Sequence, residues 1–314
     1  MSSYRLHRPG PHLVVALVTP FAGAGEVDHA SLRRLVAHLQ AGGVDEFFVN
    51  GSTGEAPLLD EADRLAVLET VRAAAPDGTV YAGVSGLGHR HAIRNARAAA
   101  AAGADAAVVM SPFFVALDQR QLGDFAAAIA DASPIPLAVY HHLRMPTPFA
   151  VPTVARLAAH PNIFAVKDTN GGDQDRCAEI LAATAGRPFR FFQGVEKLVL
   201  STLQAGGHGC VVAQGNLAPR LYRDLFDAWQ AGETARAAGL QQQIDALWAI
   251  FTRPEVRQSF AHFLHTLKLP LHERGVLAST AGALPGVAIE PEFSRMVSEF
   301  MQTRLEPAPA SRAP

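Results

Sequence analysis

The sequence contains only three lysines, Lys167, Lys197 and Lys268, so the position of each one is informative. Lys167 ends the apolar run IFAVK, and loss of solvation at the end of a buried strand favours the neutral amine. A neutral amine can attack a carbonyl carbon and form a Schiff base. The alternative is a lysine that reaches solvent or pairs with Asp168. Lys197 and Lys268 fall in stretches with helical spacing, where we expect surface or interface positions.

Two further segments carry polar groups that suit carbonyl chemistry. Tyr140 ends the apolar run LAVY, and its phenol could move a proton to or from the oxygen of a carbinolamine. An amphipathic tyrosine at the rim of the fold is the alternative. The loop NGSTGE, residues 50–55, places Ser52 and Thr53 between glycines, where backbone N–H groups can hold an anion. Together with Lys167, these residues predict an amine, an acid/base group and an anion cradle.

The 13 histidines raise the question of a metal site. The close pairs are His89/His91, His141/His142 and His262/His265. Neighbouring strand residues such as His141 and His142 point in opposite directions, which makes a poor chelate. We therefore expect no metal, although a metal-dependent enzyme is kept as an alternative. Both His141 and His142 lie close to the expected site, and one of them could contact a substrate.

Eight short apolar runs alternate with longer amphipathic stretches over most of the chain. Each run is continuous in its apolar residues, as in strands covered on both faces of a parallel sheet. A turn and about 10–16 residues with helical spacing follow each run. The runs are Leu13–Val18, Glu46–Val49, Val80–Val84, Ala106–Met110, Leu137–Tyr140, Ile163–Lys167, Phe189–Gln193 and Gly209–Ala213.

Boundary residues support the same alternation. Asp28 and Asp60 suit the N-caps of two helices. Segments 41–50, 101–110 and 205–214 each contain glycine just before a strand, where a left-handed residue ends the helix. This weak repeat predicts an α/β fold, a (β/α)8 TIM barrel. A doubly wound sheet is the competitor, but no GxGxxG follows an early strand.

The predicted organisation has four parts. Residues 1–11 form an N-terminal extension and residues 12–230 the barrel. Residues 231–304 form a helical C-terminal appendage, with helices over 232–268 and 286–303. The Pro/Ala/Arg-rich residues 305–314 are expected to be disordered. In such barrels the active site lies at the carboxyl ends of the strands, where Lys167, Tyr140 and the 50–55 loop are predicted to meet.

Composition narrows the class of protein. A hydrophobic fraction of 49% and a net charge of -2 argue against disorder and against a nucleic-acid binder. Cys177 and Cys210 are too few for a disulfide scaffold and suit a reducing compartment. No apolar run approaches the ~20 residues that cross a membrane. We expect a cytoplasmic enzyme that acts on a small molecule, without a nucleic-acid or membrane partner.

Six motifs together resemble the dihydrodipicolinate synthase / N-acetylneuraminate lyase family. They are ALVTPF (16–21), NGSTGE (50–55), SPFF (111–114), VYHH (139–142), AVKD (165–168) and AGGHG (205–209). The likeness covers most of the chain. It implies a Schiff-base lyase that handles pyruvate or another 2-oxo acid. It also implies a homotetramer, arranged as a dimer of dimers, with no metal or organic cofactor.

The resemblance also implies roles for individual residues. Lys167 would form the Schiff base and Tyr140 would move protons. Ser52 and Thr53, with Gly51 in the same loop, would hold the carboxylate of pyruvate. Two positions that line the keto-acid pocket in the family are here Gly194 and Val211.

Three positions depart from the synthases of the lysine pathway. Phe114 stands where those synthases carry a tyrosine that acts across subunits. Arg144 is displaced by one position from an arginine that binds an aldehyde substrate's carboxylate. Glu196 matches an acid that lyases of polyhydroxylated substrates use to bind sugar hydroxyls. With His141 and His142, these are the candidates for the specificity pocket.

The departures favour a pyruvate-dependent aldolase for a 2-keto-3-deoxy sugar acid or a similar 2-oxo acid. A dehydratase of such acids is the nearest alternative. A true 4-hydroxy-tetrahydrodipicolinate synthase and a regulatory relative that only binds a 2-oxo acid are the others. These proteins would share one set of core residues, so the sequence does not choose between cleavage and dehydration.

Overall fold

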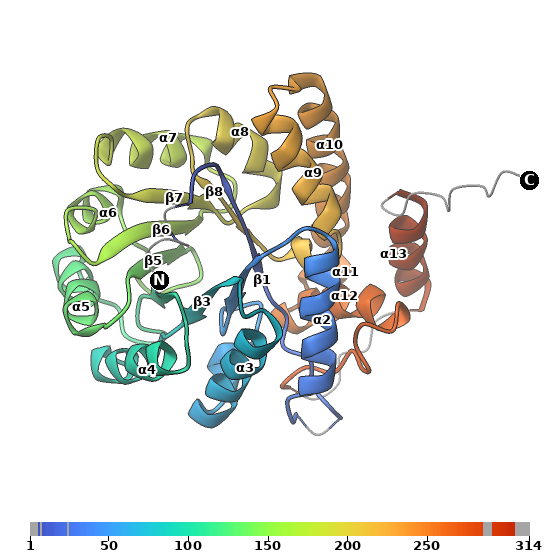
Figure 1. Cartoon of the computed structure of the whole chain (residues 1–314), viewed down its shortest axis with the longest axis horizontal. Helices are drawn as coiled ribbons and strands as arrows, with labels where there is room; N and C mark the ends of the chain where they lie inside the picture. The colour runs from blue at the N-terminus through green and yellow to red at the C-terminus, as the bar shows by residue number, and fades with distance from the viewer. Residues whose placement is uncertain (1–5, 7, 24, 285–290, 305–314) are drawn as a thin grey trace, which may run out of the picture.

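The computed structural model describes residues 6, 8–23, 25–284 and 291–304. Its centre is a closed barrel of eight parallel strands in chain order, in which β8 pairs with β1 (Figure 1). The strands are β1 (His12–Ala16), β2 (Glu46–Val49), β3 (Thr79–Gly83), β4 (Ala106–Met110), β5 (Leu137–His142), β6 (Ile163–Thr169), β7 (Arg190–Gln193) and β8 (Gly209–Val212). The predicted (β/α)8 TIM barrel is confirmed.

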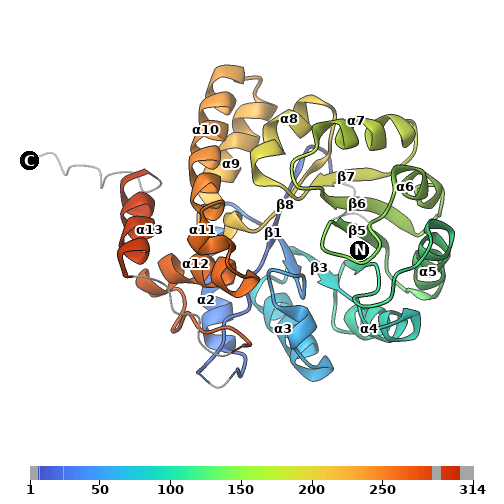
Figure 2. The ribbon, with the colours of Figure 1, turned by 180° about the vertical axis from the view of Figure 1, so that it is seen from behind.

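Helices ring the barrel on its outside, as both views of the ribbon show (Figures 1 and 2). They are α2 (His29–Ala41), α3 (Glu61–Ala74), α4 (His89–Ala101), α5 (Gln119–Ala132), α6 (Val151–Leu157), α7 (Gln174–Ala183), α8 (Val199–Gln204) and α9 (Pro219–Gln230). Short 3-10 turns follow three of the strands: η1 (Ala56–Leu58), η2 (Glu196–Leu198) and η3 (Gln214–Asn216).

The predicted boundary residues act as expected. The carboxylate of Asp28 accepts hydrogen bonds from the N–H groups of the first turn of α2, and that of Asp60 does so for α3. Gly43, Gly103 and Gly206 have φ values of 83°, 86° and 91°, in the left-handed region that glycine adopts without strain. These glycines turn the chain from α2, α4 and α8 into the next strand.

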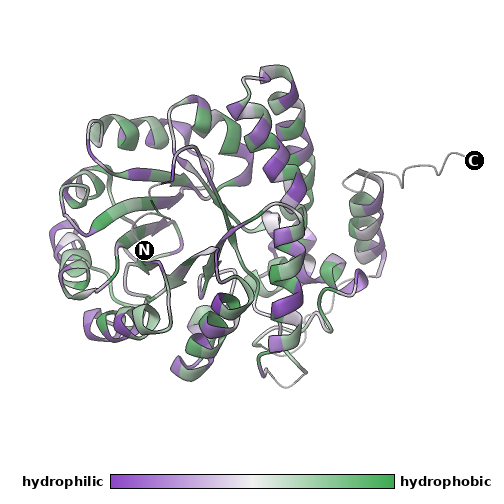
Figure 3. Cartoon of the chain, viewed as in Figure 1, coloured by the Kyte–Doolittle hydropathy of each residue, from purple (hydrophilic) through white to green (hydrophobic). Residues whose placement is uncertain are grey.

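Side chains of the strands alternate between two apolar layers. Along β1, Leu13 and Val15 pack between the barrel and the helices, whereas Val14 and Ala16 fill the barrel interior. Figure 3 shows hydrophobic strands at the centre and helices whose hydrophilic residues lie mainly on the outer side. The same alternation places Tyr140 in the interior. Function-bearing side chains on the strands can therefore be assigned to the interior or the outer layer by their parity.

Charged residues fill the amino-terminal end of the barrel. The Glu46 carboxylate accepts hydrogen bonds from the Tyr81 hydroxyl at 2.8 Å and from His12 Nδ1 at 2.8 Å. Arg8 also pairs with Glu46. Glu46 and His12 are fully buried. These groups occupy the end of the barrel opposite to the carboxyl ends of the strands, where Lys167 and Tyr140 lie.

The C-terminal region is helical but more broken than predicted. Its helices are α10 (Thr234–Phe251), α11 (Pro254–Arg257), α12 (Phe260–Glu273) and α13 (Pro291–Arg304). The single helix expected over 232–268 is wrong, because Pro254 cannot continue α10 and starts α11 instead. In Figures 1 and 2, α13 stands beside the barrel rather than in its ring. Residues 286–290 of the second expected helix lie outside the described residues, as does the tail 305–314.

Within the described ranges, none of the helices is long and apolar enough to cross a membrane.

Candidate active site

An amine and a phenol face each other inside the barrel at the carboxyl ends of β5 and β6. Tyr140 and Lys167 are direct partners in the parallel register of these strands. Lys167 Nζ lies 4.0 Å from the centre of the Tyr140 ring and 5.1 Å from that of Phe48. Only 5% of Lys167 and 2% of Tyr140 are exposed. The amine is thus held against aromatic rings and away from bulk water.

The environment of Tyr140 favours its ionised form. Burial by itself would raise the pKa of the phenol. The positive charge of Lys167 and the hydrogen bonds of Ser52 and Lys167 outweigh burial, so the pKa of Tyr140 lies below its ordinary value of 10.0. A phenol with a lowered pKa gives up its proton more readily than free tyrosine does. Tyr140 is therefore suited to proton transfer beside the amine.

The loop after β2 brings a hydroxyl to the phenol. Ser52 Oγ lies 3.3 Å from the Tyr140 hydroxyl oxygen. The backbone is left-handed on both sides of this turn, with φ 56° at Asn50 and 57° at Glu55. Thr53 is buried. A Cβ at Gly51 would lie 2.6 Å from the Phe48 ring, so only glycine allows this close approach.

The same loop is tied to the C-terminal helices by a buried ion pair. Lys268 Nζ donates to Glu55 Oε1 at 2.7 Å and to the carbonyl oxygen of Ala281 at 2.8 Å. Glu55 Oε2 accepts from the N–H of Ala283 at 2.8 Å. The expectation of a surface or interface position is wrong for Lys268, which is completely buried within the chain. For Lys197, which is exposed, the expectation is confirmed.

The two neighbouring histidines of β5 point to different layers. His141 packs outside the barrel, where its Nδ1 lies 3.0 Å from the carbonyl oxygen of Phe149 and its Nε2 3.8 Å from Asp168. His142 faces the cavity that begins at Tyr140, and the two rings meet edge-on with centres 5.7 Å apart. The structure therefore brings His142, and not His141, to the predicted site. Sequence parity carries this signal, because Tyr140 and His142 are two residues apart.

Burial lowers the pKa of His142 to about 4, and the charges of Lys167 and Arg144 act in the same direction. The ring is consequently neutral at neutral pH. Its Nδ1 accepts a hydrogen bond from the N–H of Arg144 at 3.0 Å, which leaves the proton on Nε2. His142 can then donate a hydrogen bond into the cavity.

Gly194 directly follows β7 and lies beside the end of β6, and Val211 is a residue of β8. The N–H of Gly194 donates to the carbonyl oxygen of Asp168 at 2.8 Å. A Cβ at Gly194 would lie 2.1 Å from Thr169 Oγ1, so β7 can approach β6 here only with glycine. Val211 belongs to the interior apolar layer with Tyr140.

One carboxylate oxygen of Glu196 is bound to the backbone. Its Oε1 accepts from the N–H groups of Ala213 at 3.0 Å and Gln214 at 3.3 Å. The side chain is buried, and burial raises the pKa of the carboxyl. Its position is set by the need of these two N–H groups for an acceptor. The structure does not place Glu196 among the residues that line the cavity.

Arg144 and Phe114 also differ in their placement. Arg144 lines the cavity, and its guanidinium carbon lies 5.0 Å from the centre of the Phe260 ring. Phe114 is 89% exposed and lies outside the cavity lining, whereas its neighbour Phe113 lines the cavity. The side chain of Phe114 therefore reaches no part of this site within its own chain.

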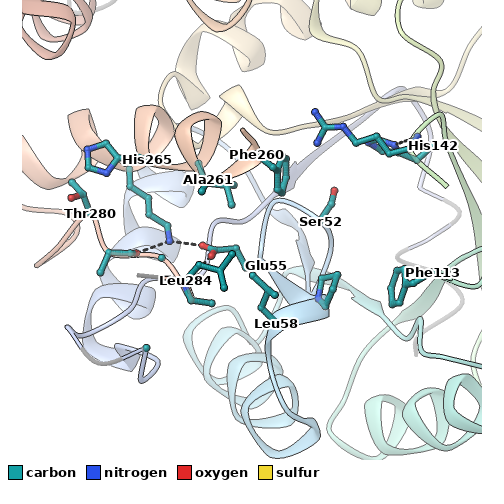
Figure 4. Close-up of a pocket in the computed structure, with 18 of the residues that line it drawn as sticks. Ser52, Glu55, Leu58, Phe113, His142, Phe260, Ala261, His265, Thr280 and Leu284 are labelled. Carbon is teal, nitrogen blue, oxygen red and sulfur yellow. Dashed lines mark hydrogen bonds and ion pairs between the residues drawn. The ribbon is translucent and has the colours of Figure 1, made fainter. Parts of the chain in front are cut away.

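A cavity of about 690 Å³ opens above these residues, as Figure 4 shows. Ser52, Met110 and His142 form the part nearest to Lys167 and Tyr140. The C-terminal region supplies the opposite wall through α12 and residues 280–284. The sequence patterns did not predict this wall, because Phe260, Leu264 and Lys268 are more than a hundred residues away from the strands that they face. The scarcity of lysine was the one signal that could have drawn attention to Lys268.

No group of three or more His, Cys, Asp or Glu side chains that could bind a metal ion occurs in the part of the chain that the structure describes.

Comparison with known proteins shows the family of the chain. Residues 11–303 match the model of the dihydrodipicolinate synthetase family. A 4-hydroxy-tetrahydrodipicolinate synthase of Streptomyces coelicolor is 36% identical over 230 residues, which are 73% of this chain and 74% of that protein. A second synthase, from Acidiphilium cryptum, is 36% identical over 242 residues, 75% of this chain and 82% of that protein.

Solved structures agree as well. A dihydrodipicolinate synthase of Acinetobacter baumannii, solved in complex with pyruvate, superposes with a TM-score of 0.83 at 26% identity. That match covers 93% of this chain and 98% of the other.

A (β/α)8 barrel with an amine and a phenol at the carboxyl ends of adjacent strands has the groups that a Schiff-base enzyme needs. The chain belongs to the dihydrodipicolinate synthetase family. It is accordingly a class I lyase, and the regulatory, non-enzymatic alternative is not favoured because the relatives and structural neighbours are enzymes.

Proposed function

We propose that the chain is a pyruvate-dependent aldolase, which makes or breaks the carbon–carbon bond between a pyruvate unit and an aldehyde. The observation that supports this most directly is the Lys167 amine 4.0 Å from the Tyr140 ring. The Ser52 hydroxyl, 3.3 Å from the phenol oxygen, completes the group. Nucleophile, acid/base group and hydroxyl together supply what Schiff-base chemistry needs. Lys167, Tyr140 and Ser52 are the proposed catalytic residues.

The proposed cleavage starts with attack of the Lys167 amine on the ketone of a 4-hydroxy-2-oxo acid. Loss of water gives an iminium ion, which draws electrons from the neighbouring carbons. Tyr140 takes the proton of the 4-hydroxyl, the C3–C4 bond breaks, and its electron pair forms an enamine on Lys167. An aldehyde leaves, the enamine is protonated, and water releases pyruvate and the free amine. The lowered pKa of Tyr140 raises the fraction of the phenolate, which is the form that can accept this proton.

The carboxylate of the 2-oxo acid needs partners near the amine. We propose that Ser52, Thr53 and the backbone at Gly51 supply them, since this turn lies beside Tyr140. Val211 and Gly194 would bound the pyruvyl methyl group from inside the barrel. Arg144 and His142, which line the cavity, would face the rest of the substrate. Three predicted residues do not line the cavity within one chain, so a direct contact of theirs with the substrate is not supported. They are His141, Phe114 and Glu196.

Two other reactions use the same iminium ion. A dehydratase would remove a proton from C3 and expel the 4-hydroxyl as water, which also needs an acid/base group at the place of Tyr140. The second is that of a 4-hydroxy-tetrahydrodipicolinate synthase, the name that the relatives at 36% identity carry. The sugar-acid substrate was predicted from Phe114, Arg144 and Glu196. Of these, Arg144 lines the cavity, and Glu196 Oε1 accepts hydrogen bonds from the backbone.

Trapping of the Schiff base tests the proposal. The protein is incubated with pyruvate and borohydride, and its intact mass is measured. We expect a reduced pyruvyl adduct on wild type and on Lys197→Ala, whose side chain is exposed, but none on Lys167→Ala. Absence of the adduct from wild type, or its presence on Lys167→Ala, would contradict the mechanism. Product analysis with 4-hydroxy-2-oxo acids then separates pyruvate release from dehydration.

We also propose a homotetramer, a dimer of dimers, located in the cytoplasm. Phe114 and Val115, 89% and 53% exposed, are apolar side chains that a second copy could cover. The two free, buried thiols, Cys177 and Cys210, suit a reducing compartment. Sedimentation of wild type and Phe114→Asp tests the assembly: the substitution should shift the protein toward smaller species.

A further inference from the structure

The cavity above the amine has an inner end and an outer end with different chemistry. Ser52 marks the inner end, beside Tyr140, and His265 and Thr280 lie on the far side of Glu55 and Lys268 (Figure 4). Whatever is joined to the pyruvyl unit at Lys167 must extend from the inner end between these walls. The walls therefore select the aldehyde portion of the substrate.

Most of the walls between these two ends are apolar. The apolar side chains of the walls are aromatic, thioether or aliphatic, and they come from five separate segments of the chain. They are Leu58, Met110, Phe113, Met145, Phe260, Leu264 and Leu284. Leu58 and Leu284 are 49% and 53% exposed, although both line the cavity. An apolar body placed here would remove these side chains from water.

Glu55 and Lys268, two of the charged groups in the walls, are engaged with each other and with the backbone. Both oxygens of Glu55 are occupied, one by Lys268 and the other by the N–H of Ala283. Lys268 also donates to Ala281. His142 accepts from the backbone of Arg144, whose guanidinium lies over Phe260. Along the apolar part of the walls, a chain of hydroxyl groups would lose its water, and the side chains there offer it no strong hydrogen bond in return.

From these walls we infer that the aldehyde partner carries an apolar body, an aryl ring or an alkyl chain, rather than a chain of hydroxyl groups. This inference rests on the proposed Schiff-base function and specifies its substrate. In the synthetic direction, the pyruvate enamine on Lys167 attacks the aldehyde carbon and forms the C3–C4 bond. Tyr140 gives its proton to the aldehyde oxygen, and water releases a 4-hydroxy-2-oxo acid. The cavity volume of about 690 Å³ accommodates a body of this size.

A comparison of aldehydes tests the inference. Pyruvate is supplied with benzaldehyde or with glyceraldehyde, and kcat/KM for each aldehyde is obtained from the rate of 4-hydroxy-2-oxo acid formation. We expect benzaldehyde to be favoured by about tenfold or more. Equal or better use of glyceraldehyde would overturn the inference while leaving the aldolase intact. Borohydride trapping with pyruvate is run in parallel, and its failure would overturn the proposed function itself.

Substitutions in the wall provide the second test. Leu58→Gln changes an exposed leucine that lines the cavity, and Leu87→Gln changes an exposed leucine outside it, so neither should disturb folding. We expect Leu58→Gln and Phe260→Gln to lower the preference for benzaldehyde about tenfold, with KM for pyruvate unchanged. Leu87→Gln should retain the wild-type preference. If both wall variants kept the wild-type preference for benzaldehyde over glyceraldehyde, these walls would not select the aldehyde.

Discussion

Lys268 Nζ lies 2.7 Å from Glu55 Oε1 across 213 residues of sequence, and this ion pair joins helix α12 to the loop that carries Ser52. Both side chains are buried. The pair also bounds the cavity at the end away from Ser52. The ion pair thus links the C-terminal region to Glu55, the left-handed residue that ends the turn around Ser52 and Thr53.

Breaking this pair should destabilise the protein strongly. In Lys268→Met the Glu55 carboxylate would stay buried without a counter-charge, so we expect a loss of about 3–5 kcal/mol in the free energy of unfolding. Urea unfolding measures it. Lys197→Met is the matched control, since Lys197 is exposed, and should change stability by less than about 0.5 kcal/mol. Equal stability of the two variants would show that the pair contributes little.

Removal of the Tyr140 hydroxyl should impair turnover but not Schiff-base formation. We expect Tyr140→Phe to lower kcat by about 10²–10⁴-fold, because the acid/base group is lost, while borohydride still traps pyruvate on Lys167. The pKa of Tyr140 lies below its ordinary value of 10.0, so the wild-type rate should rise with pH with a midpoint below that value. Tyr140→Phe should lack this rise. A variant with the wild-type pH profile would exclude Tyr140 as the base.

Loss of the Ser52 hydroxyl should weaken the binding of pyruvate. Hydrogen bonds to charged groups contribute about 1.5–3 kcal/mol, so Ser52→Ala should raise KM for pyruvate by about tenfold or more. Thr234→Ala, which removes an exposed hydroxyl at the start of α10, is the control and should leave KM unchanged. Steady-state kinetics with varied pyruvate measure both. An unchanged KM in Ser52→Ala would remove Ser52 from the carboxylate site.

Substitution of two glycines by alanine should change the stability of the protein in opposite directions. A methyl group at Gly194 would collide with Thr169 Oγ1 and the carbonyl oxygen of Asp168, so Gly194→Ala should cost about 1–3 kcal/mol. Gly239 lies inside α10 with open space around it, and Gly239→Ala should stabilise by up to about 1 kcal/mol. Thermal unfolding should move in opposite directions. The same sign of change in both variants would mean that the space around these two glycines does not decide their effect on stability.

The buried Asp168 should make stability depend on pH. Burial raises the pKa of its carboxyl from 3.8 to about 6, against the opposing effect of Arg176. The folded state therefore holds this proton more tightly than the unfolded state. Its stabilising contribution is complete below about pH 3.8 and is lost as the pH rises through about 6. Urea unfolding of Asp168→Asn should lack this component between these two values, and an identical pH dependence in both proteins would exclude it.

The barrel and its central pair of residues follow from local rules. Buried strands show as continuous apolar runs, and capping residues mark the helices between them, so the eight strands were predicted within a few residues. Lys167 and Tyr140 end adjacent strands, and closure of a parallel barrel necessarily brings such positions together. Parity along β5 could also have separated His142 from His141, but it was used only to argue against a chelate, and both histidines were kept as candidates.

The outer half of the site had no such local signal. Lys268 and Phe260 lie on a helix that no periodicity ties to a given strand, so only packing of α12 against the loop after β2 placed them at the cavity. Glu196 matches a substrate-binding position by sequence, but its Oε1 accepts hydrogen bonds from the N–H groups of Ala213 and Gln214. The sequence by itself determined the barrel and the amine–phenol pair, because strand order and parity are short-range properties. Tertiary packing alone decided which residues wall the cavity, because contacts across more than a hundred residues depend on how whole helices pack.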